Sequence, residues 1–193
     1  MLSYDLSDHH LLEREVKRLP LQAQVFFPIE APFLKGHGVS DSCSLWDIGC
    51  GDGSWLYLFR SAFPNSAITG LDRSPEILAC ARKQNPGTRF LLVDEKNISE
   101  VLLRGDFNVA LLRFSLQHMS PDITMRILSA LRFRKAPTRV IAIDGDDHSF
   151  VFRPTSDAIQ ALIDAKGRKQ AAQGGDRHIG SRLPELFPVS ASG

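Results

Sequence analysis

Residues 45–53 read Leu-Trp-Asp-Ile-Gly-Cys-Gly-Asp-Gly, an apolar run that carries one acid and passes into three glycines separated by single residues. A helical pattern over residues 54–63 follows at once. This order predicts a buried parallel strand that turns sharply into a helix. Glycine suits such a turn because it adopts positive φ and lets a ligand approach the bare backbone closely.

The spacing of these glycines helps to distinguish a dinucleotide from a ligand that carries an ammonium group. A dinucleotide site uses G-x-G-x-x-G, which places the pyrophosphate at the helix N-terminus. Here the pattern is G-x-G-x-G, and Ser54 stands where the third dinucleotide glycine would be. Asp47 precedes the first glycine, where a carboxylate would repel a pyrophosphate but can hold an ammonium group. The loop therefore argues against a dinucleotide, although an unrelated glycine turn remains an alternative for this segment taken alone.

A second acid stands in register with the glycine loop. Residues 67–72 predict another short buried strand, which ends at Asp72, nineteen residues after Gly53. An acid at this spacing can accept hydrogen bonds from both hydroxyls of a ribose. The alternative is that Asp72 only caps the next helix, but Ser74 as N-cap and Pro75 at the first helical position already serve that purpose.

The glycine loop and the acid together resemble motif I, and the acid that follows it, of the class I S-adenosylmethionine (SAM) dependent methyltransferases. The resemblance covers roughly residues 40–187 and is strongest up to Asp72. It implies SAM as cofactor and S-adenosylhomocysteine (SAH) as product, with Asp47 and the loop at the methionine end and Asp72 at the ribose. The cofactor-binding residues that it implies are Asp47, Gly49, Cys50, Gly51, Gly53, Asp72, Arg73, Asp94, Glu95 and Arg113.

Later segments extend the resemblance. The predicted strand 89–93 ends at Asp94, which by the resemblance receives the adenine amino group; the alternative is an ordinary solvated loop acid. The predicted strand 107–113 runs into the stretch Arg113 to His118, which is similar to the family's motif IV region. Cys50 lies within the glycine loop, either as a reactive thiol or as a small filler.

The composition fits a single globular domain. The chain has 193 residues, 43% of them hydrophobic and 23% charged, which is ordinary for a soluble protein. The formal net charge of +1 gives no general attraction to nucleic acid or to a membrane surface. The three cysteines are odd in number and lack metal-ligand spacing, so we expect reduced thiols, no metal site and a cytoplasmic protein. The sequence also shows no signal peptide and no apolar run of membrane-spanning length.

Two parts are expected within that domain. Residues 1–40 predict a helical lid segment, with a helix broken at Pro20 and a second short helix over residues 21–27. Residues 41–193 predict the cofactor-binding domain, an α/β, Rossmann-like doubly wound, mostly parallel sheet with helices on both faces. The expected strands are 44–48, 67–71, 89–93, 107–113 and 139–143, and the expected helices are 54–63, 75–84, 121–134, 155–172 and 181–187.

The fifth predicted strand raises a question about partners. The family's sheet ends in an antiparallel hairpin beside this strand, and the sequence shows no such hairpin before residue 193. Residues 139–143 are too apolar for a comfortable free edge. Either another chain covers this edge, the tail folds back over it, or the protein is a shortened one. Of these we expect coverage by another chain, as a homodimer contact or a protein partner.

The resemblance implies transfer of a methyl group to a small molecule by in-line displacement. His118 is the candidate general base, because the ordinary pKa of histidine lies near physiological pH. Arg113 is expected either to orient a substrate carboxylate or to pair with an acid of the loop, and His148 and His178 are further pocket candidates. Two alternatives stay open: a catalytically inactive SAM-binding scaffold that works through a partner, and a nucleotide-dependent α/β enzyme.

Overall fold

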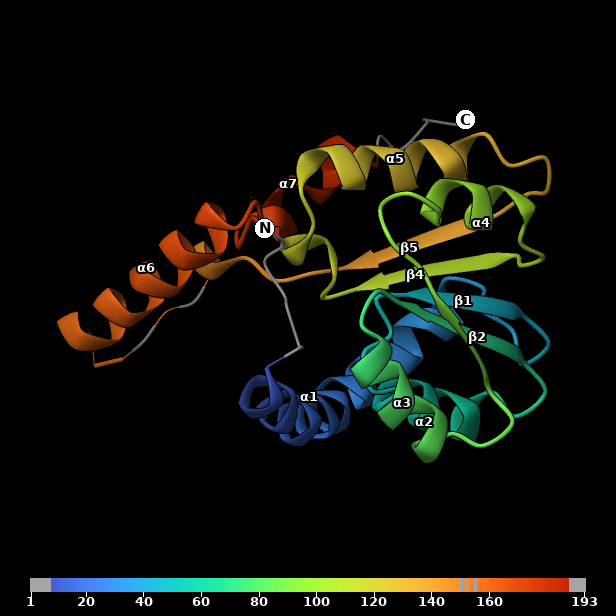
Figure 1. The fold of residues 1–193 in the computed structure, drawn as a ribbon, viewed down its shortest axis with the longest axis horizontal. Coiled ribbons are helices and arrows are strands. Elements are labelled where there is room, and N and C mark those ends of the chain that lie inside the picture. Colours follow the sequence, from blue (N-terminus) through green and yellow to red (C-terminus); the bar gives the residue numbers. More distant parts are fainter. Residues whose placement is uncertain (1–7, 150, 152, 155, 188–193) are drawn as a thin grey trace.

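The computed structural model describes residues 8–149, 151, 153, 154 and 156–187. Its centre is a sheet of five parallel strands in the order β3-β2-β1-β4-β5 (Figure 1). The order reverses between β1 and β4, and ligands of such sheets bind at this point, beyond the carboxyl ends of the strands. The strands are β1 (Ser44–Ile48), β2 (Ala67–Asp72), β3 (Arg89–Leu92), β4 (Val109–Arg113) and β5 (Arg139–Ile143).

Helices cover both faces of the sheet, as the alternating sequence predicts. In Figure 1, α1, α2 and α3 lie below the sheet, α4, α5 and α7 lie above it, and α6 extends to one side. Two separate hydrophobic clusters fill these layers, because successive strand side chains point to opposite faces. The helices are α1 (His9–Gly36), α2 (Ser54–Ala62), α3 (Pro75–Gln84), α4 (Ile98–Arg104), α5 (Pro121–Arg132), α6 (Asp157–Ala172) and α7 (Ile179–Leu186), with the short 3-10 helices η1 (Leu116–His118) and η2 (Asp147–Ser149).

The expected break in the N-terminal segment is wrong. α1 is one helix of 28 residues that runs through Pro20, Pro28 and Pro32. Each internal proline removes a backbone hydrogen bond and crowds the preceding turn, at a cost of about 3 kcal/mol. Packing of α1 against α2 offsets this cost, since Ala23 and Leu34 of α1 are fully buried in one hydrophobic cluster with the side chains of α2.

The other element boundaries agree closely with those expected. All five strands are present, each within two residues of the predicted bounds, and Ser74 caps α3 as expected by accepting from the Ile77 N–H at 3.2 Å. α4 was not predicted from the sequence, because a seven-residue helix has too few turns to show a periodic pattern. The predicted start of α6 at residue 155 lies outside the described residues, and α6 is described from Asp157.

Strand β5 forms one edge of the sheet in the described part of the chain. Its apolar side chains are covered on the two faces: Ile141 and Ile143 pack with the cluster beside α2, and Val140 and Ala142 with the cluster beside α5. The apolar character of the strand is therefore explained by packing within the chain. Coverage of its backbone edge by a second copy or a partner stays a prediction.

Gly49 lies close to Ser115 in the segment after β4, and a side chain at Gly49 is expected to destabilise the fold. Its φ is +87°, and an added Cβ would lie 2.6 Å from Ser115 Cβ. We expect Gly49→Ala to lower the free energy of unfolding by about 2–4 kcal/mol, from the positive φ and the clash together.

The matched control is Gly87→Ala, where φ is +83° but no atom lies within 4 Å of the added Cβ. This variant isolates the conformational cost of about 1–2 kcal/mol. Urea unfolding of both variants checks the prediction. Equal losses of stability in the two variants would show that the contact with Ser115 adds nothing to the cost of a side chain at Gly49.

Candidate active site

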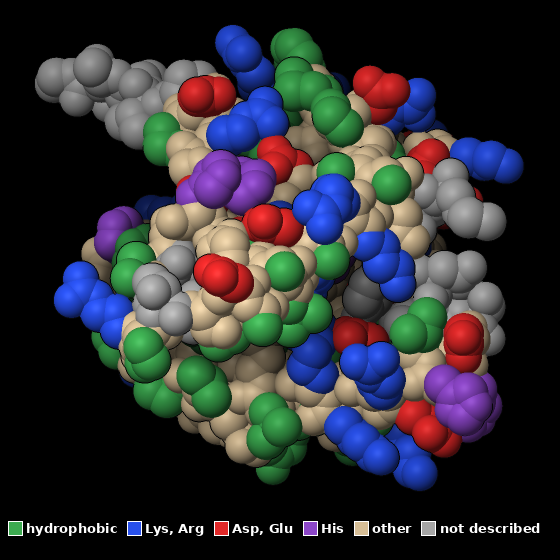
Figure 2. Space-filling model, turned by 90° about the vertical axis from the view of Figure 1, so that its left-hand side faces the viewer, with side chains coloured by type: hydrophobic (Ala, Val, Ile, Leu, Met, Phe, Trp, Pro, Cys, Tyr) green, Lys and Arg blue, Asp and Glu red, His purple; other side chains and the backbone are tan. Residues whose placement is uncertain are grey.

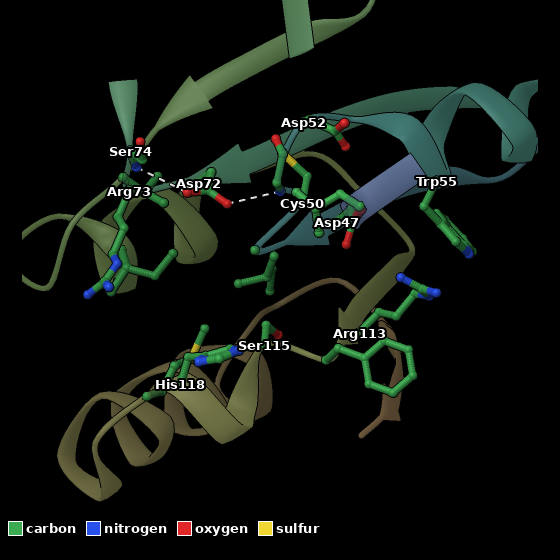
Figure 3. A pocket seen from close by; sticks show the side chains of 18 of the residues that line it. Asp47, Cys50, Asp52, Trp55, Asp72, Arg73, Ser74, Arg113, Ser115 and His118 are labelled. Atoms are coloured by element: carbon green, nitrogen blue, oxygen red, sulfur yellow. Dashed lines mark hydrogen bonds between the residues drawn. The ribbon is translucent and has the colours of Figure 1, made fainter. Parts of the chain in front are cut away.

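A cavity of about 700 Å³ opens at the carboxyl ends of β1, β2 and β4, at the point where the strand order reverses. This volume suits a ligand of cofactor size. Its walls come from the glycine loop, the segments after β2, β3 and β4, and helix α1 (Figure 3). The α1 residues at the cavity are Arg18, Leu19, Gln22 and Ala23. The predicted lid segment thus borders the predicted site.

The glycine loop and Asp72 form one hydrogen-bonded unit. The Gly51 N–H donates to Asp72 Oδ2 and the Ser74 N–H to Asp72 Oδ1, both at 3.0 Å (Figure 3). The Cys50 N–H donates to the Leu71 carbonyl at 2.9 Å. Asp72 is buried, and burial raises the pKa of its carboxyl. Each Asp72 oxygen keeps one further lone pair, so the carboxylate can still accept two hydroxyl donors at the cavity.

Asp47 and Arg113 reach the same cavity from the neighbouring strands β1 and β4. Asp47 is fully buried, and burial raises the pKa of its carboxyl to about 7, against the lowering effect of the Arg113 charge. Among the described residues, Asp47 Oδ1 and Arg113 Nη2 are buried atoms that have no hydrogen-bond partner. A buried acceptor or donor without a hydrogen-bond partner lowers the stability of a folded protein. The two atoms therefore indicate that a polar ligand binds here.

Glu30 of α1 fixes the Arg113 guanidinium. Arg113 Nε donates to Glu30 Oε1 at 2.8 Å and Oε2 at 2.9 Å, and Trp55 Nε1 donates to Glu30 Oε2 at 2.6 Å. The two charged side chains are only 8% and 6% exposed. Of the two roles predicted for Arg113, pairing with an acid is therefore observed, but the acid belongs to α1 and not to the glycine loop. Arg113 lines the cavity, and its buried Nη2 has no hydrogen-bond partner among the described residues.

His118 lies in η1 on the cavity wall. Burial, the largest cause, lowers the pKa of its imidazole to about 4, and the Arg18 charge adds to the effect. The ring is therefore neutral at physiological pH, as a proton acceptor must be, but it is a weaker base than an ordinary histidine. The role predicted for His118 rested on the ordinary pKa of histidine, because the sequence does not reveal that the ring is buried.

Three further residues predicted to bind the cofactor lie at the cavity. Arg73, Asp94 and Glu95 line the cavity with the residues above. Asp94 Oδ1 also accepts from the backbone N–H groups of Lys96 at 2.8 Å and Asn97 at 3.0 Å, so this oxygen already supports the start of α4. Contact between Asp94 and an adenine amino group stays a prediction.

The surroundings of Gly53 and Cys50 indicate that these two residues support the fold of the glycine loop. Gly53 does not line the cavity; its φ is +73°, and an added Cβ would lie 2.7 Å from Asn85 Nδ2. Cys50 is buried at the cavity wall, and burial raises the pKa of its thiol well above the ordinary value. A protonated, buried thiol is unreactive. These surroundings favour the small filler over the reactive thiol for Cys50.

Several cavity residues were missed in the sequence. Trp55 and Ser115 line the cavity, and the buried Ser115 hydroxyl has no hydrogen-bond partner in the described part of the chain. Glu30, which pairs with Arg113 of the cavity wall, was also not predicted. The φ of +51° at Phe114, unusual for a residue with a side chain, turns the chain at the end of β4 just before Ser115. That dihedral angle leaves no signal in the sequence.

The fold and the site together define a Rossmann-like protein with a glycine loop after β1 and a buried acid, Asp72, at the end of β2. Residues 46–138 match the protein family described as "Methyltransferase domain". Residues 46–138 therefore carry a methyltransferase domain of the class I, SAM-dependent type.

Curated relatives share short segments with this chain. It is 46% identical over 48 residues to a trans-aconitate 2-methyltransferase of Acidovorax sp. (strain JS42), covering 25% of this chain and 19% of that protein. It is 30% identical over 109 residues to a tRNA (carboxymethyluridine(34)-5-O)-methyltransferase of Saccharomyces cerevisiae, covering 55% of this chain and 37% of that protein. The matched segments thus span about a fifth to two fifths of these relatives.

Solved structures share the fold. The plantazolicin methyltransferase BpumL in complex with SAH superposes with a TM-score of 0.67 at 18% identity, covering 98% of this chain and 72% of that chain. The mitomycin 7-O-methyltransferase MmcR gives a TM-score of 0.58 at 22% identity, covering 92% of this chain and 52% of that chain.

Within the described residues, no helix combines the length and the apolarity that crossing a membrane requires.

Proposed function

We propose that this chain binds SAM in the cavity and transfers its methyl group to a small molecule. The observation that carries the proposal is the pair of buried atoms, Asp47 Oδ1 and Arg113 Nη2, that lack a partner among the described residues. An α-amino acid supplies both missing partners: its ammonium group donates to Asp47 and its carboxylate accepts from Arg113. The methionine end of SAM carries this pair of groups.

The other cofactor contacts follow from the same geometry. Asp72 would accept from the two ribose hydroxyls, held in place by its bonds to the backbone of Gly51 and Ser74. Helix α1 would cover the bound cofactor as a lid, with Leu19 against Gly51, where an added Cβ would lie 3.0 Å from Leu19 Cδ1. SAM supplies an activated methyl group, so the protein has to position the acceptor, exclude water and receive a proton.

A small acceptor is favoured over nucleic acid. The net charge is +1, and the face shown in Figure 2 carries basic and acidic side chains interspersed and not a continuous basic surface. Recognition of a phosphate backbone depends on such a surface. The trans-aconitate methyltransferases among the relatives carry the name of a small-molecule substrate.

The proposal is tested by incubating the purified chain with SAM labelled in the methyl group and a panel of small hydroxy, carboxylic and amino compounds. Release of SAH that depends on one class of acceptor supports it. Binding of SAH without transfer to any acceptor would favour the inactive SAM-binding scaffold instead.

Affinity for SAH is expected to depend on pH through Asp47. The buried Asp47 carboxyl holds its proton up to about pH 7, and the incoming ammonium group must displace that proton. Affinity should therefore rise about tenfold per pH unit below about pH 7 and level off above it. Calorimetry between about pH 5.5 and pH 8 measures this slope.

The matched variant for this pH series is Asp47→Asn, which keeps the size of the side chain and cannot titrate. It should bind SAH weakly and with a flat pH dependence. An unchanged slope in Asp47→Asn would assign the titration to another carboxyl, such as the buried Asp72.

His118 is expected to act on turnover and not on cofactor binding. Loss of a general base lowers kcat by about 100-fold or more, so His118→Gln should show this loss while the Kd for SAH changes less than about threefold. Because burial lowers the pKa of His118 to about 4, kcat of the unmodified chain should show no inflection near pH 6.5 from this group. A kcat retained in His118→Gln would remove His118 from the reaction.

A further inference from the structure

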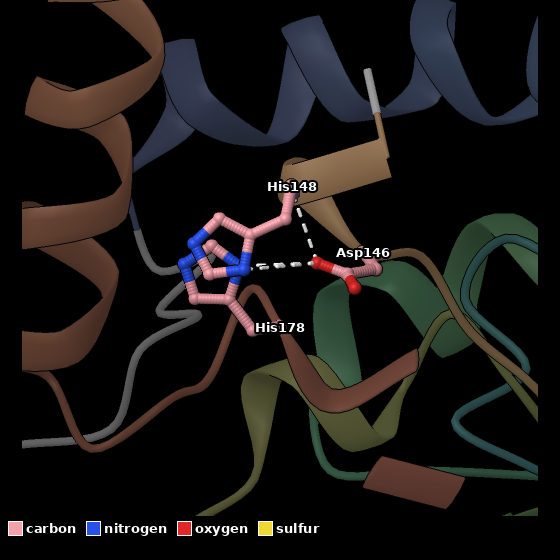
Figure 4. Close-up of side chains that lie close together, drawn as sticks. All are labelled: Asp146, His148 and His178. Atoms are coloured by element: carbon pink, nitrogen blue, oxygen red, sulfur yellow. Dashed lines mark hydrogen bonds and ion pairs between the residues drawn. The ribbon is translucent and has the colours of Figure 1, made fainter. Parts of the chain in front are cut away.

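Three polar side chains meet outside the cavity, near the carboxyl end of β5. Asp146 and His148 belong to the segment that follows β5, and His178 precedes α7, thirty-two residues after Asp146. His178 Nδ1 lies 3.1 Å and His148 Nδ1 3.8 Å from the same oxygen, Asp146 Oδ1 (Figure 4). One ligand atom of each residue lies within 4.8 Å of the other two.

The 3.1 Å between His178 Nδ1 and Asp146 Oδ1 suits two ligands of one metal ion, and the 3.8 Å between His148 Nδ1 and the same oxygen is somewhat longer. Zinc binds imidazole nitrogen and carboxylate oxygen at about 2.0–2.2 Å, which places neighbouring ligand atoms about 2.9–3.4 Å apart at angles from 90° to tetrahedral. The rings of His148 and His178 stack with centroids 3.6 Å apart and an interplanar angle of 13°. Both rings therefore turn the same nitrogen toward Asp146. The His148 side chain is 76% exposed and can make the remaining adjustment by rotation.

The backbone and the neighbouring charges hold this arrangement before any ion binds. Asp146 Oδ1 accepts from the His148 N–H at 2.9 Å, and the His178 N–H donates to Asp176 Oδ1 at 2.9 Å. Next to them, Asp147 and Arg177 form a bidentate ion pair that joins the two segments. A site built on two segments clamped in this way loses little freedom when it binds an ion.

The ligand set selects the class of ion. Two imidazoles and one carboxylate suit zinc, cobalt and nickel, whereas magnesium and calcium take oxygen ligands. Three protein ligands leave at least one coordination position for water or another small ligand. We propose that Asp146, His148 and His178 bind one divalent transition-metal ion through Asp146 Oδ1 and the two Nδ1 atoms.

The ion would reinforce the wall behind the cavity. Arg177, beside the site, extends Nη1 to Gln117 Oε1 at 3.3 Å, and the Asp176 N–H donates to the Gln117 carbonyl at 2.9 Å. Gln117 directly precedes His118 of the cavity wall. Metal binding is therefore expected to raise the midpoint of thermal unfolding, since an ion that binds only the folded state stabilises it. This proposal does not depend on methyl transfer.

The test is calorimetric titration of the full chain with Zn²⁺, together with absorption spectroscopy of the Co²⁺ form. We expect one ion per chain with micromolar or tighter affinity, and a cobalt spectrum without a thiolate charge-transfer band. Replacing His148 or His178 by phenylalanine keeps the ring stack and removes one ligand nitrogen, so each variant should bind at least about tenfold more weakly.

The control is His10→Ala, which removes an exposed histidine outside the cluster and should leave the affinity unchanged. Thermal unfolding without metal shows whether each variant folds. Should the phenylalanine variants fail to fold, Asp146→Asn keeps an oxygen for the His148 N–H and should still weaken binding. Absence of saturable Zn²⁺ binding below about 100 µM, or binding that survives both phenylalanine substitutions, would overturn the proposal.

Discussion

Replacing Asp72 by asparagine is expected to weaken SAH binding about 100-fold or more. Hydrogen bonds to a charged group contribute about 1.5–3 kcal/mol each, and the amide loses that charge at both ribose hydroxyls. The amide keeps one oxygen, so one of the two bonds from the Gly51 and Ser74 N–H groups can persist. Calorimetric titration of Asp72→Asn with SAH measures the loss.

A second buried carboxylate in the same loop provides the matched control. Asp52 Oδ1 accepts from the Ser54 N–H at 3.0 Å, and Oδ2 accepts from Ser54 Oγ at 2.7 Å and Gln84 Nε2 at 3.4 Å. Since these groups already occupy it, Asp52→Asn should change stability more than SAH affinity. Equal losses of affinity in both variants would mean that Asp72 acts by general loop order and not by holding the ribose.

Removing the positive charge of Arg113 is expected to destabilise the whole fold. Arg113→Met leaves the buried Glu30 carboxylate with the Trp55 N–H as its one remaining partner among the described residues. Breaking a buried ion pair on one side costs about 3–5 kcal/mol, because the remaining charge stays desolvated. Urea unfolding of the variant should show this decrease in the free energy of unfolding.

The double variant Glu30→Gln with Arg113→Met separates two effects of this pair. Removing both charges eliminates the desolvated carboxylate, so we expect the double variant to recover much of the lost stability. SAH affinity should remain low, since no cation then faces the carboxylate of the methionine end. Recovery of affinity together with stability would argue that Arg113 serves the fold alone.

The sheet and the glycine loop were predictable because their signals are local. Strands such as residues 44–48 are short apolar runs bounded by turn residues, and the distance from Gly53 to Asp72 fits one helix and one loop. The sequence therefore locates the cavity and most of its walls. The match of residues 46–138 to the methyltransferase family agrees with that prediction.

Features that depend on contacts between distant residues were not predictable. Glu30 and Arg113 lie 83 residues apart, and neither segment shows that they pair. Pro20 has a strong local tendency to end a helix, yet α1 continues through it because tertiary packing outweighs the local cost. The low pKa of His118 likewise follows from burial, which spacing does not reveal. The cluster of Asp146, His148 and His178 forms only when segments on either side of α6 meet.

Calorimetric titration of the unmodified 193-residue chain with SAH at about pH 8 tests the central claim most directly. At this pH Asp47 is ionised, and its buried oxygen and Arg113 Nη2 should both find partners in the amino-acid end of the ligand. We predict binding of one SAH per chain with micromolar affinity. A chain that unfolds cooperatively and shows no heat of SAH binding would contradict the proposed cofactor site.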